Sequence, residues 1–264
     1  MANPETSSPR IRACLFDMDG LLLDTEDLYN KCNNIILHEY GRPNIPWKVK
    51  AQMQGRPGPE AAAIFHAWAQ LPLPRSTFIA KQAALQAQYF PFARPLPGVP
   101  LLLKTLKRNP SIHLALATSS HARNFKIKSQ HHQGLFSAFA EKHRILGDDA
   151  RIPAGRGKPA PDIYLLALET INRELRAKGG REIKPGECLV FEDSVPGVEA
   201  GRRAGMQVVW CPHPMVLKEF KGREREVLAG IANGEGDVSN LDDGWAVLVE
   251  TLEGFDYGRY GIEV

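Results

Sequence analysis

Four short apolar runs occur along the chain, and a longer segment of helical composition separates each from the next. The runs are Ala13–Phe16, Leu114–Ala117, Cys188–Phe191 and Val208–Trp210. Apolar runs of this length are typical of strands buried on both faces, as the strands of a parallel sheet are. Their alternation with helices predicts an α/β fold, in which helices cover both faces of a parallel sheet.

Polar residues directly follow three of these runs. Asp17–Gly20 follows the first, Thr118–Ser120 the second and Glu192–Ser194 the third. The carboxyl ends of parallel strands lie at one edge of the sheet, where α/β proteins bind ligands. We therefore expect these side chains to converge on one site. Asp17 and Asp19 are two residues apart, so both can face that site if the chain stays extended past the first run. A solvated turn is the alternative for this pair.

The first two runs are separated by far more residues than one crossover helix needs. Three stretches of this interval, Tyr29–Tyr40, Pro59–Gln70 and Thr77–Phe90, are rich in Ala, Gln, Leu and aromatic residues and are separated by Pro and Gly. This composition predicts helices. The interval therefore predicts a helical insertion between the first two strands.

We interpret residues 27–94 as a helical cap, and residues 10–26 and 95–264 as a discontinuous core. Hinges for a cap that closes over the site are expected after Asp24-Thr25 and in Pro91–Pro97. Beyond Pro212 the sequence is charged and rich in Gly before it becomes more apolar. This tail is too short for a normal core of its own, so we expect a peripheral helix there.

Composition narrows the class of protein further. The 264 residues are 43% hydrophobic, which suffices for a sizeable core, and 33 basic against 30 acidic residues give a net charge of +3. No block of one charge sign dominates, so we expect no nucleic acid polymer as partner. No stretch approaches the roughly 18 apolar residues of a membrane-spanning helix, so we expect no membrane partner either. Nothing in the sequence demands more than a monomer.

The four cysteines, Cys14, Cys32, Cys188 and Cys211, are widely separated. Their spacing suggests neither a disulfide framework nor a CxxC metal site. The polar segment Met1–Arg10 lacks the apolar centre of a signal peptide. These features favour a cytoplasmic location.

Two further segments, one with a lysine and one with two hydroxyl residues, can bind an anion. Lys158 lies among glycines and prolines in the loop Gly155–Asp162, where it can neutralise negative charge, although an exposed lysine is the usual alternative. Thr118 and Ser119 can bind a phosphate through hydroxyl and amide groups. A helix start, with Ser119 or Ser120 as its N-cap, is an equally good explanation for this hydroxyl segment.

The polar residues that follow the run Cys188–Phe191 indicate a metal cation. Glu192 and Asp193 provide carboxylate oxygens, and magnesium prefers oxygen ligands, few protein carboxylates and a substrate phosphate. Asp193 or Ser194 can also cap the helix that follows, and capping is compatible with metal binding. The sequence therefore predicts Mg²⁺ as cofactor.

Taken in order, the blocks FDMDGLLLDTE, ALATSS, GKPAPDI and CLVFEDSVPGVEAG resemble the four motifs of the haloacid dehalogenase-like phosphatase superfamily. The resemblance runs from about Ile11 to Cys211, and it is to the subgroup with a helical cap after the first strand. It implies a Rossmann-like core and a phosphoric monoester hydrolase that acts on a small phosphorylated metabolite.

The resemblance also implies catalytic roles. Asp17 is the nucleophile that forms an aspartyl-phosphate intermediate. Asp19 is the acid and base, and we expect burial and nearby negative charge to raise its pKa. Lys158 offsets the charge of nucleophile and phosphate.

The remaining implied roles concern phosphate and metal. The phosphate-binding residues are Gly20 with a free amide, Thr118 and Ser119. The metal ligands are Asp17, the backbone carbonyl of Asp19, and Asp193, with Glu192 nearby.

Substrate choice is expected to lie in the cap, where Arg56 in Gln54–Gly58 can meet an anionic substrate or stay exposed. The resemblance favours a nucleoside 5′-monophosphate such as pseudouridine 5′-phosphate. A sugar phosphate phosphatase or a sugar phosphomutase is the alternative, although Tyr29 stands where the hexose mutases have histidine. A phosphate-ligand sensor without activity is a third hypothesis, because a fold does not fix a function.

Overall fold

The structure is a computed structural model that describes residues 9–234 and 238–264. Six strands form one parallel sheet in the order β3-β2-β1-β4-β5-β6. The strands are β1 (Ala13–Phe16), β2 (His113–Ala117), β3 (Arg144–Ile145), β4 (Cys188–Glu192), β5 (Gln207–Trp210) and β6 (Ala246–Leu248). All four predicted strands are confirmed, and so is the Rossmann-like parallel fold.

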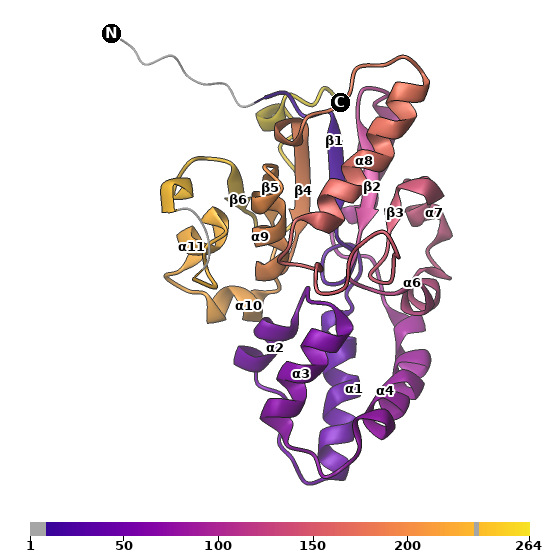
Figure 1. The fold of residues 1–264 in the computed structure, drawn as a ribbon, viewed down its shortest axis with the longest axis vertical. Coiled ribbons are helices and arrows are strands. Elements are labelled where there is room, and N and C mark those ends of the chain that lie inside the picture. The colour runs from indigo at the N-terminus through magenta and orange to yellow at the C-terminus, as the bar shows by residue number, and fades with distance from the viewer. Residues whose placement is uncertain (1–8, 235–237) are drawn as a thin grey trace.

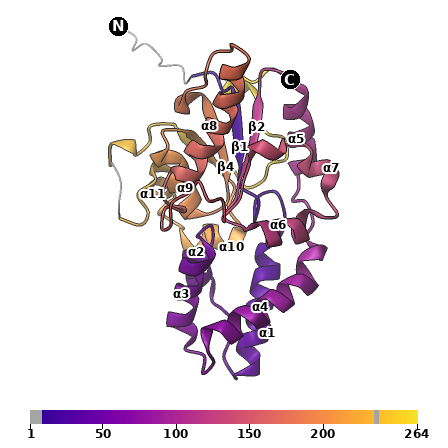
Figure 2. The ribbon, with the colours of Figure 1, turned by 45° about the vertical axis from the view of Figure 1, so that its right-hand side comes forward.

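β1 lies in the middle of the sheet and is buried on both faces. Ala13 pairs with His113 of β2 on one side and with Cys188 of β4 on the other. Successive side chains of a strand point to opposite faces. Leu15 accordingly joins the cluster that packs against α8 and α9, while Phe16 joins the cluster with α5. Figure 2 shows α8 and α9 on one side of the sheet and α5 on the other.

The described helices alternate with the strands as expected. They are α1 (Glu26–Glu39), α2 (Trp47–Met53), α3 (Gly58–Ala69), α4 (Arg75–Tyr89), α5 (Val99–Arg108), α6 (Ala122–Ser129), α7 (Gln133–Phe136), α8 (Asp162–Ala177), α9 (Val195–Arg203), α10 (Pro214–Glu219) and α11 (Glu224–Ala229). Helices were predicted at α1, α3 and α4, with ends that differ by one to three residues. The short helix α2 was not predicted.

The helices α1–α4 lie between β1 and α5 in the chain. Figure 1 shows them as a group of their own below the sheet. They pack around a separate hydrophobic cluster that includes Ile36, Phe65 and Phe78. The carboxyl ends of the strands face this group (Figure 1), so a ligand at the sheet edge lies between the two parts. The boundaries of the cap at residues 27 and 94 stay a prediction.

The tail differs from the expected peripheral helix. It contributes two short helices, α10 and α11, and the edge strand β6, which extends the sheet beside β5. α11 packs on α9, and β6 lies beside β5. Strands of two or three residues, such as β3 and β6, are too short to show a periodic pattern in sequence.

Among the described residues, no helix is both long and apolar enough to cross a membrane. All four cysteines are free thiols, and three of them are buried.

Candidate active site

A cavity of about 220 Å³ lies where the strand ends meet the helices α1–α4. Asp17, Asp19 and Thr118 line it from the strand ends. The cap lines it from α1 and α4, from the α2–α3 connection and from Phe65 of α3. Of the three predicted polar strand ends, those that follow β1 and β2 therefore line one cavity.

Asp17 emerges from the end of β1 and is almost fully buried. Its backbone N donates to the carbonyl of Phe191 at 3.1 Å, so the residue stays fixed to β4 beyond the end of the strand. Its carboxylate accepts a hydrogen bond from Lys158 Nζ at 2.5 Å. Burial raises the pKa of Asp17 to about 7, with the Lys158 ammonium acting against the rise and the Glu192 and Asp19 carboxylates adding to it.

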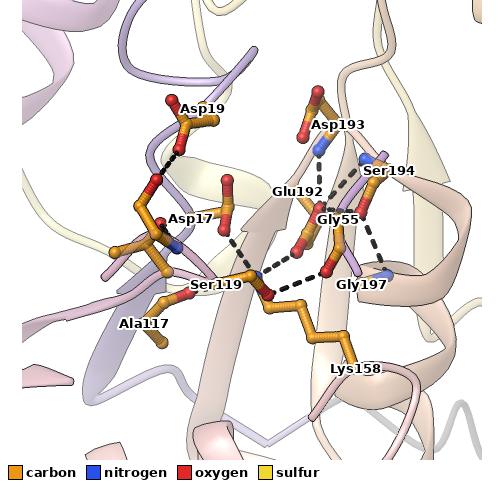
Figure 3. Close-up of polar contacts among 12 residues, drawn as sticks. Asp17, Asp19, Gly55, Ala117, Ser119, Lys158, Glu192, Asp193, Ser194 and Gly197 are labelled. Atoms are coloured by element: carbon orange, nitrogen blue, oxygen red, sulfur yellow. Dashed lines mark hydrogen bonds and ion pairs between the residues drawn. The ribbon is translucent and has the colours of Figure 1, made fainter. Parts of the chain in front are cut away.

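Lys158 is completely buried and spans three segments of the core. Besides Asp17, its Nζ donates to the carbonyl of Ala117 at 3.0 Å and to Glu192 Oε1 at 2.7 Å (Figure 3). Burial works against the charge of Lys158, but the Asp17 and Glu192 carboxylates outweigh it and raise the pKa of the lysine. An ammonium ion is thus fixed beside Asp17.

Glu192 was predicted as a group near the metal, and its two oxygens have other partners. Oε1 accepts from Lys158 and, at 2.8 Å, from the Tyr164 hydroxyl. Oε2 accepts from the backbone amides of Asp193 and Ser194 and from the Ser194 hydroxyl. This geometry makes Glu192 a positioning residue for Lys158 and for the turn into α9.

Asp19 contradicts one expectation. Its carboxylate accepts hydrogen bonds from Thr25 and Ser120 at 2.7 and 2.6 Å, and forms an ion pair with Lys128 at 2.6 Å. Burial alone would raise the pKa of Asp19, but the Lys128 ammonium and these hydrogen bonds outweigh burial and lower it. The predicted rise in pKa is therefore wrong for this arrangement, because a buried cation was not foreseen.

Lys128 lies on α6 with its side chain fully buried. Its Nζ also donates to the Tyr29 hydroxyl at 3.2 Å and to Ser120 Oγ at 2.5 Å. Sequence analysis missed this residue, since a lysine near the end of a short helix is usually exposed. The separation of Lys128 from Thr118 in the sequence did not indicate that Lys128 lies in the site.

The hydroxyl segment after β2 has two separate roles. Thr118 is buried, lines the cavity and uses its Oγ1 to accept from the Ser120 amide at 3.1 Å, so its hydroxyl proton remains available to an anion. Ser119 also lines the cavity, but its hydroxyl donates to the carbonyl of Gly55 in the cap at 2.8 Å. Ser119 therefore links the two parts of the molecule.

The amide of Gly20 is not available to a phosphate, contrary to expectation. It donates to the carbonyl of Leu23 at 2.9 Å. Gly20 has φ of 79°, and a Cβ there would lie 2.1 Å from Asp193 Oδ2. Glycine is needed at this position because a side chain would displace Asp193.

Gly55 brings the cap into contact with the core. Its φ is 76°, and a Cβ would lie 2.0 Å from Ser194 Oγ. The neighbouring Gln54 donates from Nε2 to Asp193, and its Oε1 is buried without a hydrogen-bond partner. The cap loop is therefore seated directly on the turn that carries Asp193.

The buried carboxylates fit a hard cation. Burial, with the Glu192 and Asp17 carboxylates close by, holds the pKa of Asp193 well above its usual range. Lys158 pairs with Asp17 and Glu192, and its single positive charge leaves negative charge among these three carboxylates that a cation would neutralise. Within the described ranges, no three His, Cys, Asp or Glu side chains are grouped to hold a metal by themselves. Magnesium commonly binds through one or two carboxylates, with water and phosphate completing its shell.

Arg56 lines the cavity, but its guanidinium has partners within the cap. Nε donates to the carbonyl of Gln52 at 2.9 Å, and Nη1 lies 3.6 Å from a carboxylate oxygen of Glu60. The side chain is 22% exposed. Arg56 is thus near the cavity without a contact to Asp17 or Thr118.

Known proteins resemble this chain over most of its length. The model of the haloacid dehalogenase-like hydrolases matches residues 11–205. A probable pseudouridine-5′-phosphatase of Saccharomyces cerevisiae is 38% identical over 96% of this chain and 98% of its own length. The (DL)-glycerol-3-phosphatase 2 of Arabidopsis thaliana is 36% identical over 81% of this chain and 86% of its own length.

A crystal structure of a β-phosphoglucomutase from Clostridium difficile shares the fold. Its TM-score is 0.64 at 18% identity, over 95% of this chain and 97% of that one. The resemblance found in the sequence motifs is therefore confirmed over most of the chain.

Proposed function

The chain is a phosphatase of the haloacid dehalogenase-like hydrolase family, and we propose that it hydrolyses a small phosphomonoester through an aspartyl-phosphate intermediate on Asp17. One contact supports this most: the Asp17 carboxylate lines the cavity and is paired at 2.5 Å with the fully buried Lys158. A surface turn, the alternative for the Asp-x-Asp sequence, does not bury its carboxylate beside a buried lysine.

Two displacements make up the proposed reaction. A carboxylate oxygen of Asp17 attacks phosphorus while the bond from phosphorus to the ester oxygen breaks, and Asp19 gives that oxygen a proton. Water then attacks phosphorus, Asp19 takes the proton of the water, and the bond to Asp17 breaks to release phosphate. Thr118 donates its hydroxyl proton to a phosphoryl oxygen, and Lys158 balances negative charge at the nucleophile.

Asp19 needs a proton in the first displacement, and its pairing with Lys128 opposes protonation. A phosphate dianion that enters the cavity places negative charge near Asp19, which raises the pKa of a carboxyl group. The described arrangement therefore corresponds to a resting state in which Asp19 is ionised. In that state it can act as the base of the second displacement.

Asp17, Asp193 and the backbone carbonyl of Asp19 are the groups that would hold magnesium. When bound, the ion supplies positive charge next to the transferred phosphoryl group. Enzymes accelerate phosphate-monoester hydrolysis by up to ~10²¹, and acid–base catalysis supplies only about 10² to 10⁴ of this. Most of the acceleration must therefore come from charge and position, in agreement with the density of charged groups around Asp17.

The substrate we propose is a nucleoside 5′-monophosphate such as pseudouridine 5′-phosphate. The name of the yeast relative, over nearly its whole length, supports this choice. A sugar phosphate phosphatase is the second candidate, supported by the plant glycerol-3-phosphatase. Tyr29 argues against a sugar phosphomutase, because it stands where the hexose mutases have histidine. Tyr29 lines the cavity, and its hydroxyl accepts a hydrogen bond from Lys128. We also propose a cytoplasmic location, in keeping with four free thiols, and a monomer, because nothing in the sequence demands more.

The test is phosphate release from a panel of nucleotides and sugar phosphates, with magnesium and with excess chelator. We expect release that depends on magnesium and is lost in Asp17→Asn. Asp19→Asn should retain phosphoryl transfer to Asp17 better than turnover when the leaving group is good. Acid quench after labelled substrate should place the label on the peptide that contains Asp17.

Three outcomes would contradict the proposal. Release that survives Asp17→Asn excludes the nucleophile. Isomerisation of a sugar 1-phosphate without release of phosphate identifies a mutase. Ligand binding with no turnover of any substrate identifies a sensor.

A further inference from the structure

Besides Gln54, four carboxamide side chains line the cavity. Asn33 comes from α1, Gln82 and Gln86 from α4, and Asn124 from α6. Gln82 and Gln86 are four residues apart and so lie on one face of their helix. None of the four is used in the proposed phosphoryl transfer.

The carboxamides are bonded in two pairs. Gln82 Nε2 donates to Asn33 Oδ1 at 2.9 Å, and Asn124 Nδ2 donates to Gln86 Oε1 at 3.1 Å. One such bond uses one amino group and one carbonyl, so each pair retains one amino group as donor and one carbonyl as acceptor. This count is the same whichever way the amides are turned. The four side chains therefore offer two donors and two acceptors to a ligand.

One of the remaining acceptors is buried without a partner. Asn124 is 4% exposed, and its Oδ1 has no hydrogen bond. A buried polar atom without a partner costs about 1–3 kcal/mol, and native proteins seldom leave one unless a ligand or water completes it. Since Asn124 lines the cavity, the missing partner is expected to be a donor on the ligand.

An apolar surface completes this part of the cavity. Phe65 and Phe78 both line it, and their rings are stacked with centroids 4.8 Å apart. Apolar and aromatic surface combined with a few placed polar groups is the usual composition of a small-molecule site. A planar polar ring can thus lie against this apolar part of the cavity while its edge reaches the carboxamides.

We infer that Asn33, Gln82, Gln86 and Asn124 form a recognition wall for a nucleobase that carries two carbonyl groups and ring N–H groups. The inference rests on the proposed function, because the base must belong to the phosphorylated substrate in the same cavity. The pseudouracil ring has two carbonyl oxygens and two ring N–H groups, which equals the two donors and two acceptors of the wall. The base of uridine 5′-phosphate has one ring N–H fewer.

The test compares three substrates that share a phosphorylated ribose: pseudouridine 5′-phosphate, uridine 5′-phosphate and ribose 5-phosphate. For the wild type we expect kcat/KM to fall in that order. Losing one hydrogen bond to a buried group lowers kcat/KM by about tenfold, since tenfold corresponds to 1.4 kcal/mol.

Two substitutions, one in each pair, locate the effect. Gln82→Leu and Asn124→Leu should each raise KM for pseudouridine 5′-phosphate by about tenfold and leave hydrolysis of ribose 5-phosphate within about twofold. The matched control is Gln88→Leu, because Gln88 lies on the same helix with its side chain exposed. Circular dichroism and melting temperature show whether the variants are folded.

Each result decides between the two proposals. Equal kcat/KM for the wild type on pseudouridine 5′-phosphate and ribose 5-phosphate overturns the recognition wall and leaves the phosphatase intact. A loss on ribose 5-phosphate as large as that on the nucleotide, or no change in either variant, also overturns it. Absence of phosphate release from all three substrates contradicts the proposed substrate class as well.

Discussion

At the scale of single residues, the charge on Lys128 matters because both it and its partner Asp19 have little contact with solvent: their side chains are 0% and 14% exposed. Lys128→Met leaves the Asp19 carboxylate with hydrogen bonds from Thr25 and Ser120 alone. Removing one partner of a buried ion pair destabilises a protein by about 3–5 kcal/mol. We expect a loss near the lower value, measured by urea unfolding, because those two hydrogen bonds persist.

A double variant separates charge from packing. In Lys128→Met combined with Asp19→Asn, no unpaired charge remains, so we expect a large part of the lost stability to return. Equal midpoints for Lys128→Met and the double variant would show that the unpaired Asp19 charge does not cause the lost stability. The single variant Asp19→Asn serves as the control for the loss of the carboxylate itself.

A site residue could be predicted where its neighbours in the sequence form a recognisable pattern. Asp17, Thr118 and Asp193 directly follow apolar runs, so the rules of strand and sheet geometry bring them to one edge. Lys128 and Gln54 act through contacts made in three dimensions, and their immediate sequence resembles that of exposed helices and loops. The amide of Gly20, predicted to bind phosphate, donates instead to Leu23, because this hydrogen bond depends on the local turn.

At the scale of elements, the contact between the cap loop and α9 can be tested at Gly55. A Cβ at Gly55 meets Ser194 Oγ, and its φ of 76° disfavours other residues. We expect Gly55→Ala to lower kcat/KM by about tenfold or more, because misplacing groups around a site by 1 Å can cost ~10². The assay is phosphate release at a substrate concentration below KM.

Gly41→Ala is a matched control within the cap. Gly41 also has positive φ, 63°, but a Cβ there meets nothing within 4 Å. Both variants share the backbone strain, and only Gly55→Ala adds the clash. Equal activity of the two variants would mean that this contact is not needed for catalysis.

Elements were predictable where burial imposed a pattern long enough to recognise. The run Ala13–Phe16 coincides with β1 because both faces of this central strand are buried. β6 was missed because it has three half-buried residues at the sheet edge. The peripheral helix expected in the tail followed from composition, which does not distinguish a short edge strand from a connection.

At the scale of the whole molecule, three histidines, one in the cap and two in the core, respond to acid in the same direction. Burial lowers the pKa of His66, His113 and His143. The unfolded chain binds these protons near pH ~6.5, and the folded chain only at lower pH. Their contribution to stability is therefore complete above that pH and is lost as pH falls through the folded-state values.

We expect His143→Gln to flatten the pH dependence of the melting temperature between pH values of about 7.5 and 5.5. The comparison with wild type is needed because the raised pKa of Asp17 acts in the opposite direction over this range. His131→Gln, at an exposed position, is the control. The expectation fails if all three proteins have the same slope.

The central place of β1 bears on how the chain is made in the cell. β1 is synthesised early, yet its two neighbours in the sheet come from near residues 113 and 188. While the chain is still on the ribosome, the apolar segment Ala13–Phe16 therefore stays unpaired until the neighbouring strands have been translated. Pairing between such distant segments slows folding and prolongs the exposure of apolar surface. The nascent chain is thus expected to depend on chaperones until β4 has emerged, whereas the helices α1–α4, with their local contacts, can form first.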